Sequence, residues 1–204
     1  MVKGVYDLYA DHETRGDVTI SRYIYDQDPT MDLYNLRSMR DNGGMMIMMK
    51  GGYVRMHIGK EFMMSDTKME RKSNRDFIRA ARGKVVIGGL GIGMLLHNIL
   101  DKSEVDSVLV IENNKDVIDL VAPRFAHPKL TVVHGDVFTY ETKEKFDSIY
   151  FDIWATISED NLDDIRKLHA KWKFRKTKGG GSFMTSWLMK YLQEERRKSR
   201  RDFW

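Results

Sequence analysis

The 204-residue chain contains no cysteine, so neither a disulfide framework nor a thiolate metal site is possible. This absence is typical of a reducing compartment, and we expect a cytoplasmic protein. The opening segment MVKGVYDLYADHE carries acidic residues where a signal peptide needs an apolar run. The longest apolar stretches, Met45–Met49 and Val85–Leu96, are too short or too rich in glycine to span a bilayer. No membrane association is therefore expected.

The histidines also lack a functional pattern. None of the six is spaced as metal ligands are, and His97 and His134 are interpreted as packed or solvent-edge residues. No metal site is predicted. The hydrophobic content of 42% supports a real core, and the length suits one sizeable α/β domain with a small appendage.

The formal net charge of +4 conceals an asymmetry between two parts of the chain. Residues 166–204 hold 13 Lys and Arg against 3 Asp and Glu, a net charge of +10, and the remaining residues hold 21 against 27, a net charge of −6. A basic tail on an acidic body can contact nucleic acid or dock on the acidic face of another subunit. Composition leaves both possibilities open.

The segment VVIGGLGIGMLLHNIL, residues 85–100, is the most informative part of the chain. Three β-compatible residues run into a glycine-rich turn, and an apolar segment that can form a helix follows. Such a turn brings bare backbone N–H groups and the positive end of a helix to one point, which suits a nucleotide or nucleoside cofactor. A second predicted strand, Val108–Glu112, ends in an acid that can accept hydrogen bonds from ribose hydroxyls. The glycines of the turn are Gly88, Gly89, Gly91 and Gly93.

Residues 1–66 show alternation and tight turns, which predict a small antiparallel β-domain. Two-residue turns are expected at Gly51-Gly52 and Gly59-Lys60. The methionines of this region are interpreted as packing residues. The expected strands are Val18–Tyr25, Gly44–Lys50, Tyr53–Ile58 and Glu61–Ser65. The methionines are Met45, Met46, Met48, Met49, Met56, Met63 and Met64.

Residues 67–204 are expected to form a second domain. A helix over Asp66–Arg82 with Gly83 as its stop precedes a regular alternation of strands and helices, which predicts a doubly wound, mostly parallel sheet. Ligands of such sheets bind beyond the carboxyl ends of the strands. The expected strands are Val85–Ile87, Val108–Glu112, Leu130–His134, Ser148–Asp152 and Ser182–Ser186; the expected helices are Met94–Leu100, Asp116–Phe125, Glu159–Lys171 and Leu188–Arg200.

These motifs, between about residues 44 and 155, resemble the class I S-adenosylmethionine-dependent methyltransferase superfamily, and within it the spermidine synthase (aminopropyltransferase) branch. The carrying segments are VVIGGLGIG, LVIENNKDVIDLVAPRF, TVVHGDVFTY and FDSIYFDIW. The resemblance implies a Rossmann-like fold, a cofactor of S-adenosylmethionine or its decarboxylated form, and a homodimer built through the N-terminal sheet. It implies that Glu112 binds the ribose with Asn113 beside it. Asp136 would accept from the adenine amino group, Val137 would line the ring, and Asp152 would be catalytic.

The chain also departs from that branch. Gly91 replaces an acid within the turn, which is expected to leave room for the carboxylate of intact S-adenosylmethionine. Ala155 and Thr156 replace a second acid and a proline, and the expected tyrosine and acid are not evident in Thr67–Ser73. The sheet is expected to end after its fifth strand. The leading hypothesis is therefore methyl transfer to an unidentified small-molecule acceptor, with aminopropyl transfer to a polyamine as the alternative.

Other interpretations are less favoured by the residues. The glycine spacing G-x-G-x-G differs from the dinucleotide pattern, and no lysine follows as in a P-loop. Tyr150 and Trp154 shape an acceptor pocket or belong to the core. Residues 167–178 hold six basic residues with Trp172 and Phe174 among them, which suits nucleic acid or a solvated helix. A catalytically idle member kept as a binding or assembly module is the alternative from another class.

Overall fold

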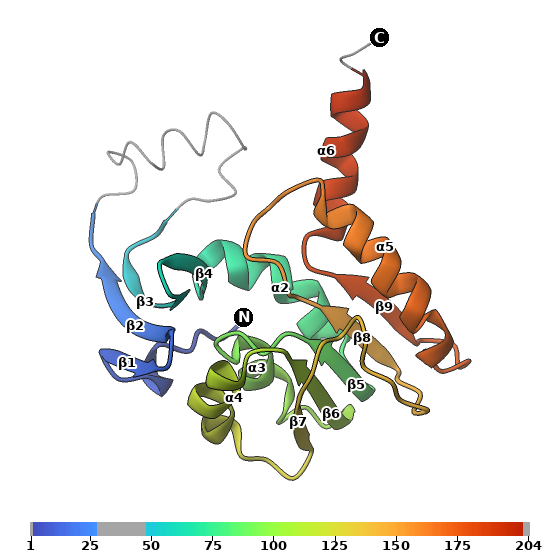
Figure 1. Ribbon diagram of the computed structural model, residues 1–204, viewed down its shortest axis with the longest axis horizontal. Helices are drawn as coiled ribbons and strands as arrows, with labels where there is room; N and C mark the ends of the chain where they lie inside the picture. The colour runs from blue at the N-terminus through green and yellow to red at the C-terminus, as the bar shows by residue number, and fades with distance from the viewer. Residues whose placement is uncertain (1, 28–47, 202–204) are drawn as a thin grey trace.

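The computed structural model describes residues 2–27 and 48–201, which form two sheets (Figure 1). The first is antiparallel and has the order β1-β2-β3-β4. A short 3-10 helix, η1 (Tyr6–Leu8), precedes it. Its strands are β1 (His12–Arg15), β2 (Val18–Tyr25), β3 (Gly51–Ile58) and β4 (Glu61–Ser65).

The second sheet is parallel and has the order β7-β6-β5-β8-β9. The chain begins at the central strand β5, moves outward to β7, and then returns past β5 to β8 and β9. This reversal on either side of the central strand defines a doubly wound sheet, so the predicted fold class is confirmed. The strands are β5 (Gly83–Gly88), β6 (Val105–Glu112), β7 (Leu130–His134), β8 (Ser148–Phe151) and β9 (Phe183–Ser186).

Helices cover both faces of the parallel sheet, because successive side chains of a strand point to opposite faces. On β5, Val85 and Ile87 pack with α2, α3 and α4, whereas Val86 packs with Leu168 and Trp172 of α5. The helices are α2 (Lys68–Ala80), α3 (Met94–Ile99), α4 (Lys115–Val121), η2 (Ala122–Phe125), α5 (Asn161–Trp172), η3 (Lys173–Arg175) and α6 (Met189–Arg201).

The antiparallel sheet lies against the α2–α4 side of the parallel sheet, and the two share one core. Ile20 and Val54 of the first sheet belong to the same buried cluster as Val85 of the second. At the edge, the guanidinium of Arg15 lies 2.8 Å from a carboxylate oxygen of Asp119 on α4. This shared core places β3 and β4 beside the turn that follows β5.

The predicted turn at Gly51-Gly52 is wrong. Both glycines belong to β3, where Gly51 pairs with Tyr25 and Gly52 with Ile24 across the ladder to β2. Glycine is needed at 52 because a Cβ there would lie 2.7 Å from the ring of Tyr6. The predicted strand Gly44–Lys50 falls largely outside the described residues, as do Met45 and Met46.

The predicted helix stop at Gly83 is also wrong, since Gly83 opens β5. Helix α2 ends at Ala80, and Lys102 donates from its Nζ to the carbonyl oxygens of Ile78, Arg79 and Ala81. A lysine at this position satisfies carbonyls that a helix end leaves without partners.

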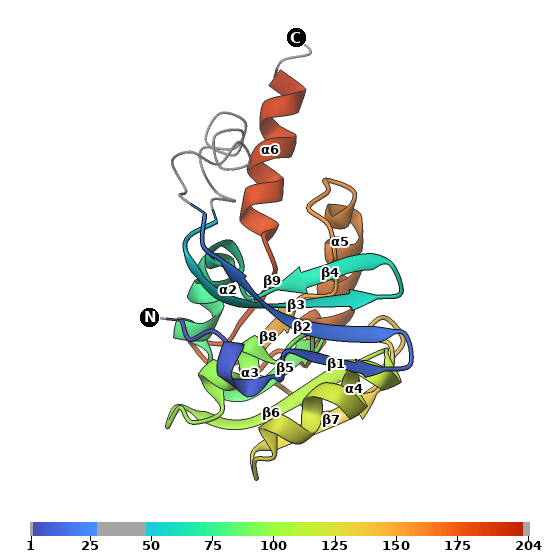
Figure 2. The ribbon, with the colours of Figure 1, turned by 90° about the vertical axis from the view of Figure 1, so that its left-hand side faces the viewer.

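Helix α6 projects from the body of the molecule in both ribbon views (Figure 2). Its base packs on α5, because Leu192 is buried with Leu162 and Ile165. Among the described residues, no helix has the length and apolar character needed to cross a membrane.

Candidate active site

The turn between β5 and α3 is a close-packed glycine loop. Gly89 has a φ of +96°, and a Cβ there would lie 2.2 Å from the carbonyl oxygen of Asp152. That oxygen belongs to the backbone, so no larger residue fits without moving the strand ends. At Gly93, a Cβ would collide with the ring of Phe125. Gly88 closes β5, and neither Gly88 nor Gly93 lines the cavity described next.

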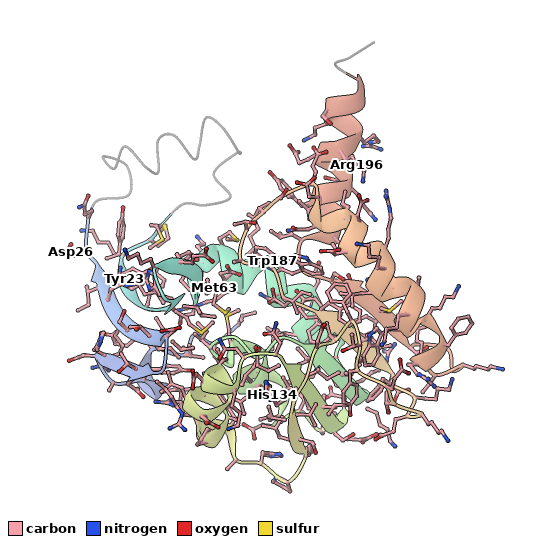
Figure 3. All side chains as sticks on the ribbon, in the orientation of Figure 1. Tyr23, Asp26, Met63, His134, Trp187 and Arg196 are labelled. Carbon is pink, nitrogen blue, oxygen red and sulfur yellow. The ribbon has the colours of Figure 1, made fainter. Side chains whose placement is uncertain are left out.

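A cavity of about 290 Å³ lies at the carboxyl ends of β5, β6 and β8, next to the loop that follows β7. Residues of β3 and β4 cover the cavity, and Met63 of β4 lines it together with Trp187, which follows β9 (Figure 3). This is where doubly wound sheets bind their ligands. The sequence-predicted site residues that line it are Gly89, Gly91, Glu112, Asn113, Asp136, Val137 and Asp152.

Glu112 is held firmly at the end of β6. One carboxylate oxygen accepts from the backbone N–H of Leu90 at 2.8 Å, and the other accepts from the backbone N–H of Asn114 at 2.8 Å. The side chain is 8% exposed. Each oxygen has a further lone pair, so the carboxylate can still accept from a ligand hydroxyl at the cavity wall.

Asp136 and Val137 follow β7 and occupy the neighbouring wall. Asp136 is exposed, and its Oδ1 accepts from the backbone N–H of Phe138 at 2.8 Å. Val137 is buried and presents an apolar surface. Asn113 is exposed, and its carbonyl oxygen lies 3.0 Å from Nε2 of His134. This wall therefore combines an apolar side chain with a carboxylate, as a purine ring would require.

The opposite wall holds an acid pair, Glu70 of α2 and Asp152 after β8. Glu70 is 8% exposed. Burial raises its pKa to about 8, with a further contribution from the charge of Asp152 and an opposing one from a hydrogen bond of Trp187. Burial also raises the pKa of Asp152 to about 7, against a hydrogen bond from Asn74. Glu70 therefore holds its proton at neutral pH, whereas Asp152 is roughly half ionised near pH 7.

Asn74 links this pair to the core. Its Oδ1 accepts from the hydroxyl of Tyr150 at 2.7 Å, and its Nδ2 donates to the backbone carbonyl of Glu70 at 3.1 Å. Tyr150 in turn stacks on Phe77 with ring centroids 4.2 Å apart. These contacts fix the direction of the polar groups around Asp152. Tyr150 thus supports the cavity from behind, whereas Trp154 lines it.

Glu70 was missed by sequence reasoning, which found no acid of interest in Thr67–Ser73. A signal was present. The buried positions of α2 are Glu70, Asn74, Phe77 and Ile78, which is the spacing of one helix face. Two polar residues on the apolar face of a helix indicate a site, because buried polar groups are costly unless they have partners or a function.

The charges around the cavity have one sign. The described residues that line it include four acids and no Lys, Arg or His. Even with Glu70 and part of Asp152 protonated, this lining disfavours an anionic ligand, because no described cationic side chain is present to pair with it. The four acids are Glu70, Glu112, Asp136 and Asp152.

Gly91 lines the cavity, and Met64 lies against one side of it. Gly91 has a φ of +52°, and a Cβ there would lie 2.4 Å from Sδ of Met64. The thioether of Met64 thus covers the turn. Met56, Met63 and Met64 all line the cavity, so packing alone does not describe their role. Methionine side chains adapt readily, since three bonds rotate.

The basic segment 167–178 is arranged as a solvated helix end. Trp172 is 1% exposed and lies in the core, so it cannot stack on a base. Phe174 is exposed. Lys171 pairs with Glu141 at 3.1 Å, and Lys167 pairs with Asp164 at 3.0 Å. In the described ranges, no three His, Asp or Glu side chains gather as metal ligands would.

No protein-family model matches this sequence, and no curated protein matches it significantly. Solved structures resemble it over about half of the chain. A spermidine synthase from Thermotoga maritima aligns at 19% identity over 56% of this chain and 46% of its own, with a TM-score of 0.42. The glycopeptide N-methyltransferase MtfA aligns at 21% identity over 53% of each chain, with a TM-score of 0.41.

A third structure is the N-methyltransferase NodS from Bradyrhizobium japonicum in complex with S-adenosyl-L-homocysteine, at 16% identity over 56% of this chain and 60% of its own, with a TM-score of 0.46. This chain thus spans about half the length of the first structures it matches. Both protein classes that the motifs resemble are among these structures. The strand order and register define the fold independently of them.

Proposed function

We propose that the protein is a transferase that takes a carbon group from an S-adenosylmethionine-type donor and delivers it to a small-molecule acceptor. One observation carries the proposal: Gly89, Glu112, Asp136 and Asp152 come from separate segments and line a single cavity. They do so beyond the carboxyl ends of parallel strands, where ligands of this architecture bind.

The residues present fit such a donor. The bare backbone of Gly89 and Gly91 forms one wall, and side chains are excluded from it by the contacts of each Cβ position. Glu112 would accept from the ribose hydroxyls, while Asp136 and Val137 would hold the adenine. The donor supplies a methyl group already activated by a positively charged sulfur. The lining holds acids and no described cationic side chain, which suits that charge although Glu70 keeps its proton at neutral pH.

Asp152 is the group that would receive the acceptor's proton. Its pKa of about 7 leaves a substantial carboxylate fraction at neutral pH and still makes that carboxylate a competent base. The hydrogen bond of Asn74 orients it. The protein's contribution would otherwise be to hold the two reactants in line and to exclude water from the cavity.

Aminopropyl transfer from decarboxylated S-adenosylmethionine is the second candidate, and three observations favour it. Glu70 supplies an acid that the sequence interpretation did not include, and no described lining residue carries a positive charge to pair with a carboxylate. Met64 lies against the Cβ position of Gly91 and narrows the space beside the turn. The decarboxylated donor keeps the ammonium group and lacks the carboxylate, which suits a narrow, acidic cavity.

Isothermal titration calorimetry with S-adenosylmethionine, its decarboxylated form and NAD tests the proposal. We expect binding of at least one sulfonium compound and no binding of NAD. Preference for the intact compound supports methyl transfer, and preference for the decarboxylated compound supports aminopropyl transfer. Absence of binding by both sulfonium compounds would contradict the proposed function.

An assembly role is the candidate from another class. Ile24 and Phe62 of the antiparallel sheet are 72% and 52% exposed, which favours a contact with another protein, such as a second copy in a homodimer. Light scattering measures the oligomeric state directly. Loss of partner binding in Glu112→Ala, together with absence of transfer activity in the unaltered protein, would favour a binding module over an enzyme.

A further inference from the structure

A second cavity lies on the other side of α2, between that helix, the edge strand β9 and the start of α6 (Figure 1). Its volume is about 590 Å³, within the range of roughly 300–1,000 Å³ typical of small-molecule sites. Glu70 and Asn74 of α2 belong to the side of the first cavity, whereas Ser73 and Phe77 line the second. The helix therefore separates two distinct spaces.

Three aromatic residues line this second cavity, but Phe77 and Tyr150 are 3% and 2% exposed, so mainly the partly buried Phe183 presents its ring to it. Phe77 stacks on Tyr150 with an interplanar angle of 13°, and Phe183 of β9 lies with its ring centroid 6.0 Å from that of Phe77. Met184 and Leu188 extend the apolar surface. Flat aromatic molecules pack well on such rings, because offset and edge contacts add to the burial of apolar area.

The rim carries the opposite charge from the first cavity. Lys72 and Arg75 of α2 and Lys190 of α6 line it, with Asp76 as its one acid among the described residues. Asp76 is engaged by Arg75 at 3.5 Å. Lys72 and Lys190 form no ion pair with a described residue and are exposed. Two lysines thus remain to pair with a ligand.

We propose that the second cavity is a binding site for a small aromatic anion, whose ring system packs on Phe183, Met184 and Leu188 and whose anionic group pairs with Lys72 and Lys190. The charge complementarity of the rim selects an anion, and the ring of Phe183 with the apolar surface beside it selects a flat apolar body. This site is distinct from the site of the proposed transfer reaction. The described charged residues that line the first cavity are all acids, so that cavity offers no partner for the anionic group of such a ligand.

The test uses the full chain with 2-naphthoate, and with 2-naphthylmethylammonium as a ligand that has the same rings and the opposite charge. Isothermal titration calorimetry measures both. We expect 2-naphthoate to bind and the ammonium compound to bind at least roughly tenfold more weakly, as two rim charges would require. Absence of naphthoate binding, or equal affinity for the two compounds, would overturn the proposal.

Two variants locate the bound molecule. Lys72→Glu with Lys190→Glu is expected to weaken naphthoate binding by roughly tenfold or more. The control, Lys60→Glu with Lys84→Glu, makes the same change in net charge at exposed residues that do not line the cavity, and its affinity should stay within about twofold. An equal loss in both double variants would contradict a local site.

A second variant does not depend on charge. Ala80→Trp places a large side chain on an exposed α2 position that lines the cavity, so it should abolish naphthoate binding while the thermal transition stays cooperative. Undiminished binding in this variant would overturn the proposal. So would displacement of naphthoate by S-adenosylhomocysteine, because it would place the naphthoate in the first cavity.

Discussion

The two ends of the first cavity hold their carboxylates in opposite ways. One end, named here the donor-rich end after its backbone hydrogen-bond donors, holds Glu112. Its two carboxylate oxygens accept hydrogen bonds from the backbone N–H groups of Leu90 and Asn114, one on each oxygen. At the acid-pair end, Glu70 and Asp152 lie close enough that the charge of Asp152 raises the pKa of Glu70, and burial raises the pKa of both. Both ends are acidic, yet only the acid-pair end lacks backbone donors among its described hydrogen bonds.

This difference assigns different tasks to the two ends. Backbone donors preorganise Glu112 as a charged acceptor, which suits the binding of hydroxyl groups. The acid-pair end exchanges a proton near neutral pH, which suits proton transfer in a reaction. Substitutions at the two ends should therefore change different measured quantities.

Asp152→Asn should have the largest effect. Removing the base at the acid-pair end is expected to lower the rate of transfer by roughly 10²–10⁴-fold, while the affinity for the sulfonium donor changes little. Steady-state kinetics and calorimetry measure the two quantities. The neutral side chain also relieves the cost of a buried charge, so the variant should remain folded at pH 8.

Glu159→Gln is the matched control, because Glu159 is an exposed acid in the loop after β8. Its rate should equal that of the unaltered protein. If Asp152→Asn kept a rate within a few-fold of the unaltered protein, proton transfer at the acid-pair end would have to be abandoned.

Glu70→Gln should change how the free energy of unfolding depends on pH. The folded pKa of Glu70, about 8, lies above the ordinary value of 4.5 expected for the unfolded chain, so the folded state holds the proton more tightly. That contribution is complete below pH 4.5 and is lost as the pH rises through 8. The unaltered protein should lose stability across this window by a few kcal/mol more than Glu70→Gln.

Denaturant unfolding at pH 5, 7 and 9 measures this effect. Glu61→Gln, at an exposed acid in β4, is the control for the loss of one acidic side chain. Parallel curves for Glu70→Gln and the unaltered protein would mean that Glu70 titrates alike in the folded and unfolded states.

Glu112→Gln tests the donor-rich end. The amide retains one acceptor oxygen but turns an NH₂ group toward the second backbone N–H, so we expect a loss of about 1–3 kcal/mol in the free energy of unfolding. The affinity for the sulfonium compound should fall roughly tenfold. The carboxylate of Asp136 accepts one backbone N–H, that of Phe138, so Asp136→Asn should lower the free energy of unfolding by less. An equal loss of stability in Asp136→Asn and Glu112→Gln would contradict a special role for the two backbone donors at Glu112.

Much of the parallel sheet could be predicted from the sequence, because its strands are short apolar runs between clear turn signals. The predicted bounds Leu130–His134 agree with β7, and Ser148–Asp152 differs from β8 by one residue. Glu112 and Asp136 were placed correctly at strand ends since parallel strands bring those ends to one edge. The antiparallel sheet was predicted less well: β1 was not expected, and the Gly51-Gly52 turn was wrong.

The acid pair could not be found by the same reasoning, because it joins α2 to the end of β8 across 82 positions of sequence. Nothing local to Glu70 indicates which residue it meets. The position of Met64 over Gly91 depends equally on how β4 packs against the glycine turn, which is a tertiary contact. The positions of strand ends can be predicted from local sequence pattern, whereas the side chains that meet in the cavity beyond them are determined by tertiary packing.

Met64→Ala should have the smallest effect, and it acts between the two ends. Shortening this side chain removes the thioether from the space beside Gly91 and leaves the backbone of the turn unchanged. Room for a carboxylate then appears next to bare N–H groups, so affinity for S-adenosylmethionine should rise relative to the decarboxylated form by several-fold, on the order of 1 kcal/mol. Met63→Ala is the matched control, since Met63 also lines the cavity and does not contact the Cβ position of Gly91. Competition calorimetry measures the ratio of the two affinities, and a ratio that changes equally in both variants would show that cavity volume, rather than the space at Gly91, governs the choice of donor.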